Sequence, residues 1–506
     1  MPECCTNPHK TPTPLSPLSL LSKAEIMSFN AYDRSNLKSG IVHFGVGNFH
    51  RAHQAVYLDQ LMRDGAAQEW AICGAGVLPG DARMRDALKE NDGLYTLLLK
   101  NPDGTIDSQT IGSIIEYNYA PEDSQGLLSK LADPDTRIVS LTVTEGGYNI
   151  DDVTGEFKAD NAAAVLDGDN PGEPKTAFGY IVEGLRLRRQ AGVEPFTVMS
   201  CDNLPGNGEV AHRAVVGQAT LSDPELAAWI DQNVSFPNSM VDRITPVTTP
   251  EDVALVHSLT GSDEAWPVTC EPYIQWVLED DFPAGRPPLE DVGVQVVQDV
   301  RPYELMKLRL LNASHQALAH WGRLLGYEFA HEAATDPDLA AFCRKYLEEE
   351  ARQTLEPVPG TDLDKYVDTL FERFGNSAIA DTLARLATDA SERMPKFLLP
   401  TAWDLTADGK DAQLAAATAA AWAAGMENST DFGGDLLVSD NAWADLKPII
   451  EQQRSGNDTA LLDYSPIFGD LGANPAFVEA YLAALAAVRS GNTREFLQTV
   501  GADISD

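Results

Sequence analysis

The sequence predicts a chain in two parts, an α/β part built on a parallel sheet and then a mostly α-helical part. Up to about residue 300, short β-rich apolar runs alternate with helical patterns, which is typical of parallel strands connected by helices. After Pro302 helical periodicity dominates, and few β-branched runs interrupt it. A chain of 506 residues is long enough for both parts. We expect the binding site in the cleft between them.

The elements expected in each part follow from these patterns. In the first part we expect strands at Ile41–Phe44, Trp70–Val77, Ile138–Thr144, Phe196–Cys201 and Gly293–Val297, and an amphipathic helix at Thr176–Arg189. This spacing predicts helices on both faces of the sheet. In the second part we expect helices at Tyr303–Leu325, Pro337–Glu350, Leu363–Arg373, Ile379–Ala390, Ala412–Ala424 and Asn474–Arg489.

We expect three regions along the chain. Residues 1–30 form a loose N-terminal arm, because this stretch is rich in Pro, Ser and Thr and lacks the basic region and apolar core of a secretory signal. The α/β part then covers residues 31–300, and the helical part covers residues 301–506.

The charge balance restricts the partners. The chain carries 37 Lys and Arg against 76 Asp and Glu, a formal net charge of −39 at pH 7. Such a field repels nucleic-acid phosphates and anionic lipid surfaces, so we expect neither nucleic acid nor membrane as a partner. No apolar run reaches the roughly 20 residues that span a bilayer. The acidic excess favours a soluble protein, and an adaptation to salt is an equally good explanation.

The cysteines indicate a compartment. Six of them, at positions 4, 5, 73, 201, 270 and 343, are too few and too scattered for a disulfide framework. None belongs to a C-x-x-C pair, which disfavours a cysteine-rich zinc site. The pattern fits a reducing cytoplasm, and we predict a cytoplasmic protein.

A dinucleotide-binding turn is the first motif that carries chemistry. In GIVHFGVGNFHRAHQAVYLDQLM a short buried strand leads through Gly45-Val46-Gly47 into a helix expected at His50–Arg63. Glycines allow backbone amides to approach a pyrophosphate, and the helix N-terminus favours negative charge. The residues expected at the cofactor are Gly45, Val46, Gly47, Asn48, Phe49 and His50. Since His50 replaces the third glycine of G-x-G-x-x-G, a purely structural turn is the alternative.

An acid follows the second strand. Asp81 stands just beyond Val77, where a carboxylate can accept hydrogen bonds from the adenosine ribose hydroxyls. Its distance from Gly45 exceeds the usual spacing of about 20 residues, so a loop must follow the helix. We expect NAD as the cofactor; the alternative is a solvated loop acid.

The strongest chemistry lies in YELMKLRLLNASHQALAHWG. Lys307, Asn312 and His315 form a K-x4-N-x2-H pattern, and on an α-helix they fall within an arc of about 140°. No other lysine lies between Lys175 and Lys345. Lysine can lose its proton when it is desolvated, so Lys307 is a candidate general base for alcohol oxidation. The alternative is an exposed lysine near two packed polar side chains.

A second pattern overlaps the first. Tyr303 and Lys307 also fit the Y-x3-K pair of short-chain dehydrogenases, in which the tyrosine is the base. Those enzymes are about half this length, have a different glycine pattern and carry the pair much earlier. Chance explains the match better here.

Several stretches together resemble one enzyme family. They are GIVHFGVGNFHRAHQA, LTVTEGGY, FTVMSCDNLPGNG, SFPNSMVDRITP, CEPYIQWVLED and MKLRLLNASH, and the similarity runs from about Tyr32 to near the C-terminus. The chain resembles the polyol-specific long-chain dehydrogenases/reductases. The resemblance implies a Rossmann-type dinucleotide-binding domain, a helical substrate and catalytic domain, and no metal. It also implies a monomer that interconverts D-mannitol and D-fructose with NAD.

The same resemblance implies roles for individual residues. Lys307 corresponds to the general acid/base, and Asn203 and Asn312 to the pair that stabilises charge on the reacting oxygen. Glu304 resembles a glutamate that governs proton exchange between base and water. His315 orients the substrate hydroxyl, and polyol-binding positions are Asp242, Arg385 and Arg393. Each has a structural alternative: Asn203 as a turn cap, Asp242 in an ion pair with Arg243, and Glu304 as a surface residue.

Two other functions stay open. A uronate reductase acting on fructuronate or tagaturonate would share the catalytic set, and Arg393 keeps this reading open because mannitol-oxidising relatives carry a lysine there. A catalytically silent dinucleotide-binding sensor is the third reading. The retained lysine and both asparagines argue against it.

Overall fold

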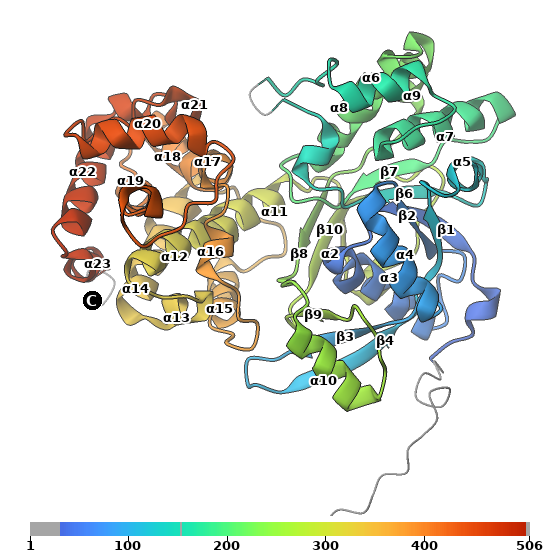
Figure 1. Cartoon of the computed structure of the whole chain (residues 1–506), viewed down its shortest axis with the longest axis horizontal. Coiled ribbons are helices and arrows are strands. Elements are labelled where there is room, and N and C mark those ends of the chain that lie inside the picture. Colours follow the sequence, from blue (N-terminus) through green and yellow to red (C-terminus); the bar gives the residue numbers. More distant parts are fainter. Residues whose placement is uncertain (1–30, 152–153, 502–506) are drawn as a thin grey trace, which may run out of the picture.

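A computed structural model describes residues 31–151 and 154–501 of the chain (Figure 1). In this view the strands lie together with the helices of the first part, and the helices of the second part form a separate mass beside them. The expected N-terminal arm, residues 1–30, lies outside the described residues. Within them, no helix combines the length and the apolar character needed to cross a membrane.

The first part is built on a five-stranded sheet in which every neighbouring pair is parallel, with strand order β5-β2-β1-β6-β7. The strands are β1 (Ser39–Phe44), β2 (Ala71–Gly76), β5 (Ile114–Tyr119), β6 (Ile138–Leu141) and β7 (Thr197–Ser200). The predicted parallel sheet is therefore confirmed. The edge strand β5 was not predicted, because only Ile114 of it is buried and its sequence IIEYNY mixes apolar with polar residues.

Both faces of this sheet are covered by helices. Along β1, Val42 packs into one apolar cluster with Leu127 of α5 (Ser124–Ala132) and Leu185 of α7 (Ala177–Ala191). The adjacent Ile41 packs into another cluster with Leu58 of α3 (Gln54–Arg63), on the opposite face because successive strand residues alternate. Further helices of this part are α2 (Asn48–Ala52), α4 (Ala82–Glu90), α6 (Ala162–Asp169), α8 (Asn207–Thr220), α9 (Pro224–Asn233) and α10 (Pro250–Thr260).

Two small sheets complete the first part. Their strands are β3 (Tyr95–Lys100), β4 (Ile106–Ile111) and β9 (Val268–Cys270) in one, and β8 (Ser239–Asp242), β10 (Gln275–Glu279) and β11 (Gln295–Val297) in the other. The strand predicted at Gly293–Val297 is thus β11, and it does not join the main sheet. It pairs with β10 instead. The prediction that this strand belongs to the main sheet was therefore wrong, because a strand's own sequence does not specify its partner.

The second part is helical. It comprises α11 (Arg301–Met306), α12 (Ala313–Leu324), α13 (Ala330–Thr335), α14 (Pro337–Lys345), α15 (Leu363–Phe374), α16 (Leu383–Leu386), α17 (Ala390–Arg393), α18 (Leu399–Ala407), α19 (Gln413–Glu427), α20 (Trp443–Arg454), α21 (Ser465–Phe468), α22 (Pro475–Arg489) and α23 (Thr493–Gly501). The alanine-rich α19 is buried on nearly all sides. Its small side chains let α12 and α22 pack closely against it, so an all-round apolar helix here is a core element.

One predicted helix is wrong. The span Ile379–Ala390 contains only the single-turn α16, flanked by Ala380 and Asp389 with φ of 50° and 51°. Thr382 caps α16 by accepting from the Arg385 amide at 3.3 Å, and the Asp389 amide donates to the Ser439 carbonyl at 2.9 Å. The two left-handed residues turn the chain at each end, which apolar spacing alone does not reveal.

The helix predicted at His50–Arg63 is also interrupted. It consists of α2 and α3, which meet at His53, where φ is −125° and ψ is −93°. The ring Nε2 of His53 lies 2.9 Å from the Gln275 carbonyl oxygen in β10. The break therefore ties the helix that follows β1 to the second small sheet.

The glycine turn after β1 yields a stability prediction. Gly45 has φ of 90°, and a Cβ there would lie 2.0 Å from the Thr142 carbonyl oxygen, whereas a Cβ at Gly47 would meet nothing closer than 3.7 Å. We expect Gly45→Ala to lower the free energy of unfolding by about 2–5 kcal/mol, through strain and overpacking. The matched Gly47→Ala should change it far less. Thermal and denaturant unfolding measure both, and equal effects would contradict this description of the turn.

Candidate active site

A cavity of about 540 Å³ lies where the two parts meet. The carboxyl ends of β1, β6 and β7 supply one side, as open parallel sheets usually do at their binding crevice. Its lining comprises Gly45, Gly47, Asn48, Phe49, His50, Thr142, Thr144, Cys201, Asp202, Asn203, Val241, Asp242, Arg243, Ile244, Thr245, Lys307, Leu311, Asn312, His315 and Arg385. Most of the predicted site residues therefore lie together.

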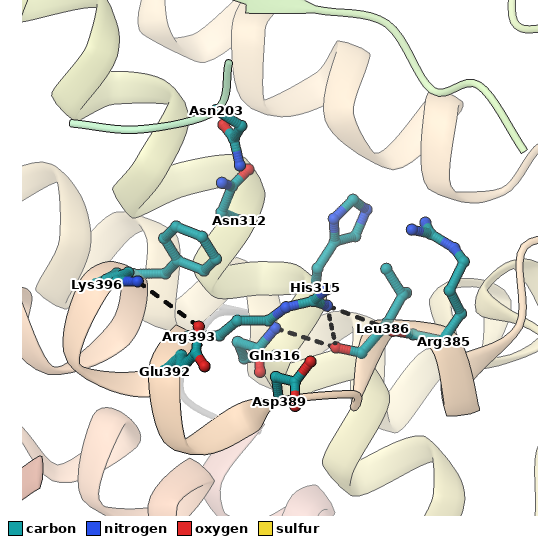
Figure 2. A pocket seen from close by; sticks show the side chains of 11 residues that line it. Asn203, Asn312, His315, Gln316, Arg385, Leu386, Asp389, Glu392, Arg393 and Lys396 are labelled. Atoms are coloured by element: carbon teal, nitrogen blue, oxygen red, sulfur yellow. Dashed lines mark hydrogen bonds and ion pairs between the residues drawn. The ribbon is translucent and has the colours of Figure 1, made fainter. Parts of the chain in front are cut away.

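A second cavity of about 230 Å³ adjoins the first (Figure 2). The two share Asn203, Asn312, His315 and Arg385, and the second extends toward α16 and α17. Its further lining residues are Gln316, Leu386, Asp389, Glu392, Arg393, Lys396 and Phe397. Of the candidate polyol-binding residues, Arg385 and Arg393 line this extension, whereas Asp242 lines only the larger cavity.

The glycine turn forms the floor of the larger cavity. Thr142 Oγ1 donates to the Gly45 carbonyl at 2.8 Å and fixes the turn against β6. Gly47 is the residue before α2, and a Cβ added to it would lie 3.7 Å from the nearest other atom. A turn whose cavity-lining residues are glycines, at the amino end of a helix, is the arrangement that admits a pyrophosphate. Val46, by contrast, is buried in the apolar core and does not line the cavity.

His50, in place of a third glycine, fills the contact between α2 and β1. Its ring stacks on that of His43, with centroids 3.4 Å apart. His43 is held in turn by Ser140 Oγ at 2.8 Å and Thr142 Oγ1 at 2.9 Å. Burial lowers the pKa of His43 to about 3 and that of His50 well below its usual value. The pair is therefore a stack of uncharged rings at neutral pH.

Asp202 explains why β6 ends before its predicted boundary. Its carboxylate accepts the amides of Val143 and Thr144 at 3.0 and 2.9 Å, and the Tyr148 hydroxyl at 2.7 Å. Thr144 has φ of 66°, so the chain leaves the strand there and curls around the carboxylate. This residue thereby fixes the loop beside the cavity and stands next to Asn203.

The amine of Lys307 is held by hydrogen bonds to two oxygens. Its Nζ donates to Asn203 Oδ1 at 2.6 Å and to the Val241 carbonyl at 2.7 Å, and the residue is 7% exposed. The side chain thus connects the end of β7, strand β8 and the helical part. Asn203 and Asn312 point toward each other in Figure 2.

The helix that carries Lys307 is not a regular α-helix. Residues Lys307–Asn312 form a π-helical segment, η5, between α11 and α12. Because a π-helix bonds residue i to residue i+5, Lys307 and Asn312 lie about one turn apart and not at the edges of the predicted α-helical arc. The widened turn brings both side chains to the same cavity.

Glu304 lies one turn before Lys307. Its carboxylate accepts the Gly206 amide at 2.8 Å, and burial, partly offset by that bond and by Lys307, raises its pKa to about 7. Glu304, Lys307 and Asn203 line one narrow pocket. The surface alternative for Glu304 is therefore wrong. Tyr303 points elsewhere, since its hydroxyl donates to the Pro359 carbonyl at 2.8 Å.

Asp242 belongs to a buried ion cluster. Arg373 of α15 donates to both oxygens of Asp242, at 2.7 and 2.9 Å, and also contacts Glu271. Arg243 donates instead to the backbone carbonyls of Ala52 and Glu271, so the alternative of an Asp242–Arg243 ion pair is wrong. His315 packs on Phe374, with centroids 4.8 Å apart, and burial lowers its pKa to about 4.

Of the remaining predicted residues, Arg385 and Arg393 line the cavities and Asp81 does not. Arg385 donates to both oxygens of Asp381, at 2.6 and 2.5 Å. Arg393 donates to the Leu386 carbonyl at 2.9 Å. Asp81 does not line either cavity, and its Oδ2 accepts the amides of Val77 and Leu78, both at 2.9 Å. Among the described residues, no cluster of three or more His, Cys, Asp or Glu could hold a metal ion.

Sequence reasoning missed three residues of this region. Arg373 and Glu271 form the cluster with Asp242, and Asp202 holds the loop next to Asn203. Asp202 and Glu271 lie inside stretches that carried the family resemblance, so they could have been flagged there. Arg373 carried no local signal, because its partners lie 131 and 102 positions away in the sequence.

Family models match both parts of the chain. Residues 39–291 match the mannitol dehydrogenase Rossmann domain, and residues 299–489 match the mannitol dehydrogenase C-terminal domain. The mannitol 2-dehydrogenase of Cereibacter sphaeroides is 45% identical over 460 residues, which cover 90% of this chain and 95% of the relative. That of Aspergillus terreus is 42% identical over 463 residues, covering 90% and 91%.

Solved structures agree with the family models. The ternary complex of Pseudomonas fluorescens mannitol 2-dehydrogenase with NAD and D-mannitol has a TM-score of 0.84 at 44% identity, covering 93% of this chain and 96% of that one. A D-sorbitol dehydrogenase in substrate-free form also has a TM-score of 0.84, at 38% identity, with 92% and 96% coverage. The chain therefore belongs to the mannitol dehydrogenase family.

Proposed function

We propose that this chain, an NAD-dependent polyol dehydrogenase, oxidises D-mannitol to D-fructose reversibly, with Lys307 as the general base. The anchored amine of Lys307 carries the proposal, because it lies in the same cavity as the glycine turn. The relatives named mannitol 2-dehydrogenase, and the NAD and D-mannitol complex of one of them, support the substrate and the product.

The cavity fits the cofactor. Gly45 and Gly47 leave the backbone open to a pyrophosphate at the start of α2. When bound there, NAD supplies the acceptor for the hydride that leaves C2 of the polyol. Asp81 is proposed to accept the ribose hydroxyls; its Oδ2 holds the loop after β2, so its Oδ1 would take the sugar.

Lys307 is suited to take the proton of the C2 hydroxyl. A neutral amine has two N–H bonds and one lone pair, and the Asn203 and Val241 oxygens are two fixed acceptors for those bonds. In oxidation, the lone pair of the neutral lysine takes the proton of the C2 hydroxyl. In reduction of fructose, the protonated lysine returns a proton to the same oxygen.

The two asparagines are proposed to stabilise charge on the reacting oxygen. Asn203 uses its Oδ1 to accept from Lys307, which leaves its NH2 group as a donor. Asn312 lines both cavities opposite it and can supply a second amide donor. Donors placed where negative charge develops take the role that zinc has in metal-dependent alcohol dehydrogenases.

Glu304 is proposed to pass the proton from Lys307 to water. Its pKa of about 7 allows it to hold or release a proton near neutral pH, and it shares a narrow pocket with Lys307. His315 and Asp242 are proposed to bind polyol hydroxyls beside the reacting carbon, with Arg385 and Arg393 at the far end.

The extension of the cavity favours a neutral substrate over a uronate. Arg385 is already compensated by Asp381, and Lys396 lies 3.8 Å from Glu392. The carboxylates of Asp389 and Glu392 line the same space. A sugar carboxylate would meet these acids as well as the cations Arg385, Arg393 and Lys396, and the chain's formal net charge of −39 adds no attraction at long range.

Several further properties are proposals of the same kind. We propose that residues 31–300 are the dinucleotide-binding domain and residues 301–506 the substrate and catalytic domain, since their main apolar clusters are largely separate. We also propose a monomer located in the cytoplasm, without nucleic-acid or membrane partners.

The identity of the base is open to direct test. Lys307→Ala should lower mannitol oxidation by about 10²–10⁴-fold, the usual loss for an acid/base group. Tyr303→Phe should retain most activity, because that hydroxyl bonds to Pro359. Steady-state NADH formation measures both, and the reverse ranking would assign the short-chain mechanism.

Chelators should leave the activity intact, because the proposed mechanism needs no metal. Activity lost to a chelator and restored by zinc would overturn the zinc-independent mechanism.

Cofactor preference tests Asp81. NAD should be preferred over NADP, because the carboxylate repels a 2′-phosphate. Asp81→Asn keeps an oxygen for the Val77 and Leu78 amides and removes the charge, so it should raise the NADP/NAD ratio of kcat/KM by about tenfold or more. Asp81→Ala should also relax the preference. Equal efficiency of the wild type with both cofactors would refute the assignment.

The substrate class is decided by an NADH-absorbance screen over mannitol, arabinitol, sorbitol, fructose, fructuronate and tagaturonate. We expect D-mannitol and D-fructose first and D-arabinitol second, because acidic side chains accompany the cations at the far end of the cavity. A higher kcat/KM for either uronate than for fructose would decide for the uronate reductase, and Arg393→Lys should then weaken uronate turnover only. No turnover with any compound would favour the silent sensor.

A further inference from the structure

Arg373 lies between the two parts of the chain, beside the proposed polyol site but outside its lining. We propose that Arg373 is a positioning residue that holds the Asp242 carboxylate in its binding orientation, so that the helical part sets one wall of the polyol site. This inference rests on the proposed function, because it takes Asp242 as a polyol-binding group.

The hydrogen bonds between Arg373 and Asp242 fix the orientation of the carboxylate relative to the guanidinium. Arg373 Nη1 donates to Asp242 Oδ2 at 2.7 Å, and Nη2 donates to Oδ1 at 2.9 Å. Nε donates to Glu271 Oε2 at 3.0 Å, and Nη2 also donates to Glu271 Oε1 at 2.8 Å. All four carboxylate oxygens thus accept from one planar guanidinium, which fixes direction as well as distance.

Further groups hold this cluster from other sides. The ring of Tyr273 stacks on the Arg373 guanidinium, 4.0 Å from its centroid. Glu271 Oε1 also accepts the Ile244 amide at 2.6 Å, two residues after Asp242. Glu271 therefore ties the guanidinium to the backbone of the segment that carries Asp242.

Burial and charge make the cluster more than a surface ion pair. The side chains of Arg373, Asp242 and Glu271 are 4%, 5% and 2% exposed. Burial opposes ionisation of Asp242, but the charge and hydrogen bonds of Arg373 hold its pKa below the ordinary value. Asp242 thus stays an ionised acceptor at the cavity, and an ionised carboxylate is the stronger partner for a polyol hydroxyl.

Another buried arginine, Arg188, has contacts typical of a purely structural role. Arg188, 1% exposed in α7, donates to the backbone carbonyls of Glu194, Leu131 and Asp133 and contacts neither cavity. Arg373 instead bonds to a side chain that lines the cavity. Arg188→Gln is therefore a matched control for loss of a buried guanidinium.

The test compares Arg373→Gln, Arg373→Lys and Arg188→Gln with the wild type, in KM for D-mannitol, KM for NAD, kcat and Tm. Arg373→Gln should raise KM for mannitol about tenfold or more and KM for NAD less than about twofold. Arg373→Lys keeps the charge without the fork and should lie between wild type and Arg373→Gln. Arg188→Gln should lower Tm while KM for mannitol stays at its wild-type value.

A wild-type KM for mannitol in Arg373→Gln, with only Tm reduced, would overturn the inference. If Arg373→Gln does not fold, Arg373→Lys decides, and an unchanged KM for mannitol in that variant would overturn it. If the wild type oxidises a different polyol, the proposed substrate fails, and the same comparison with that polyol's KM judges Arg373 separately.

Discussion

The site depends on one side chain whose amine is held between two oxygens from different elements. Lys307 Nζ donates to Asn203 Oδ1 at the end of β7 and to the Val241 carbonyl in β8. The lysine itself belongs to the helical part, so these two bonds connect both halves at the bottom of the cavity. The proposed role of Lys307 as the base requires such fixation, because a general base must lie within hydrogen-bond reach of the hydroxyl.

The rest of the site can be understood from that constraint. The π-helical segment η5 places Asn312 about one turn from Lys307, so an amide and an amine face the same space. Asp202 fixes the loop after β6 and stands next to Asn203, which supplies one of the oxygens. On the other side, the Arg373–Asp242–Glu271 cluster holds the residue that follows Val241. Asp202 and Asp242 therefore act on the lysine indirectly, because each is adjacent in sequence to one of its two hydrogen-bond acceptors.

Local sequence patterns predicted the features that depend on residues close together in the sequence. The strands of the main sheet, the turn at Gly45 and the helical run through Lys307 each leave a signal within a few residues. The structure contains all three, the last with a π-helical segment at Lys307–Asn312. Sequence could not reveal the pairing of Arg373 with Asp242, because it is a contact between distant segments. The break in the helix at Asp389 was missed for another reason. Its left-handed backbone is bonded to a remote loop, but the spacing of apolar residues around it in the sequence stays typical of a helix.

In the proposed mechanism, Lys307 and the two asparagines surround the reacting oxygen. A crystal structure of this chain with NAD and D-mannitol measures this arrangement most directly. We expect the C2 oxygen within about 2.6–3.2 Å of Lys307 Nζ, with the amide nitrogens of Asn203 and Asn312 at hydrogen-bond distance from the same oxygen. A C2 oxygen bound to His315 alone or to a metal ion, with Lys307 beyond reach, would contradict the claim.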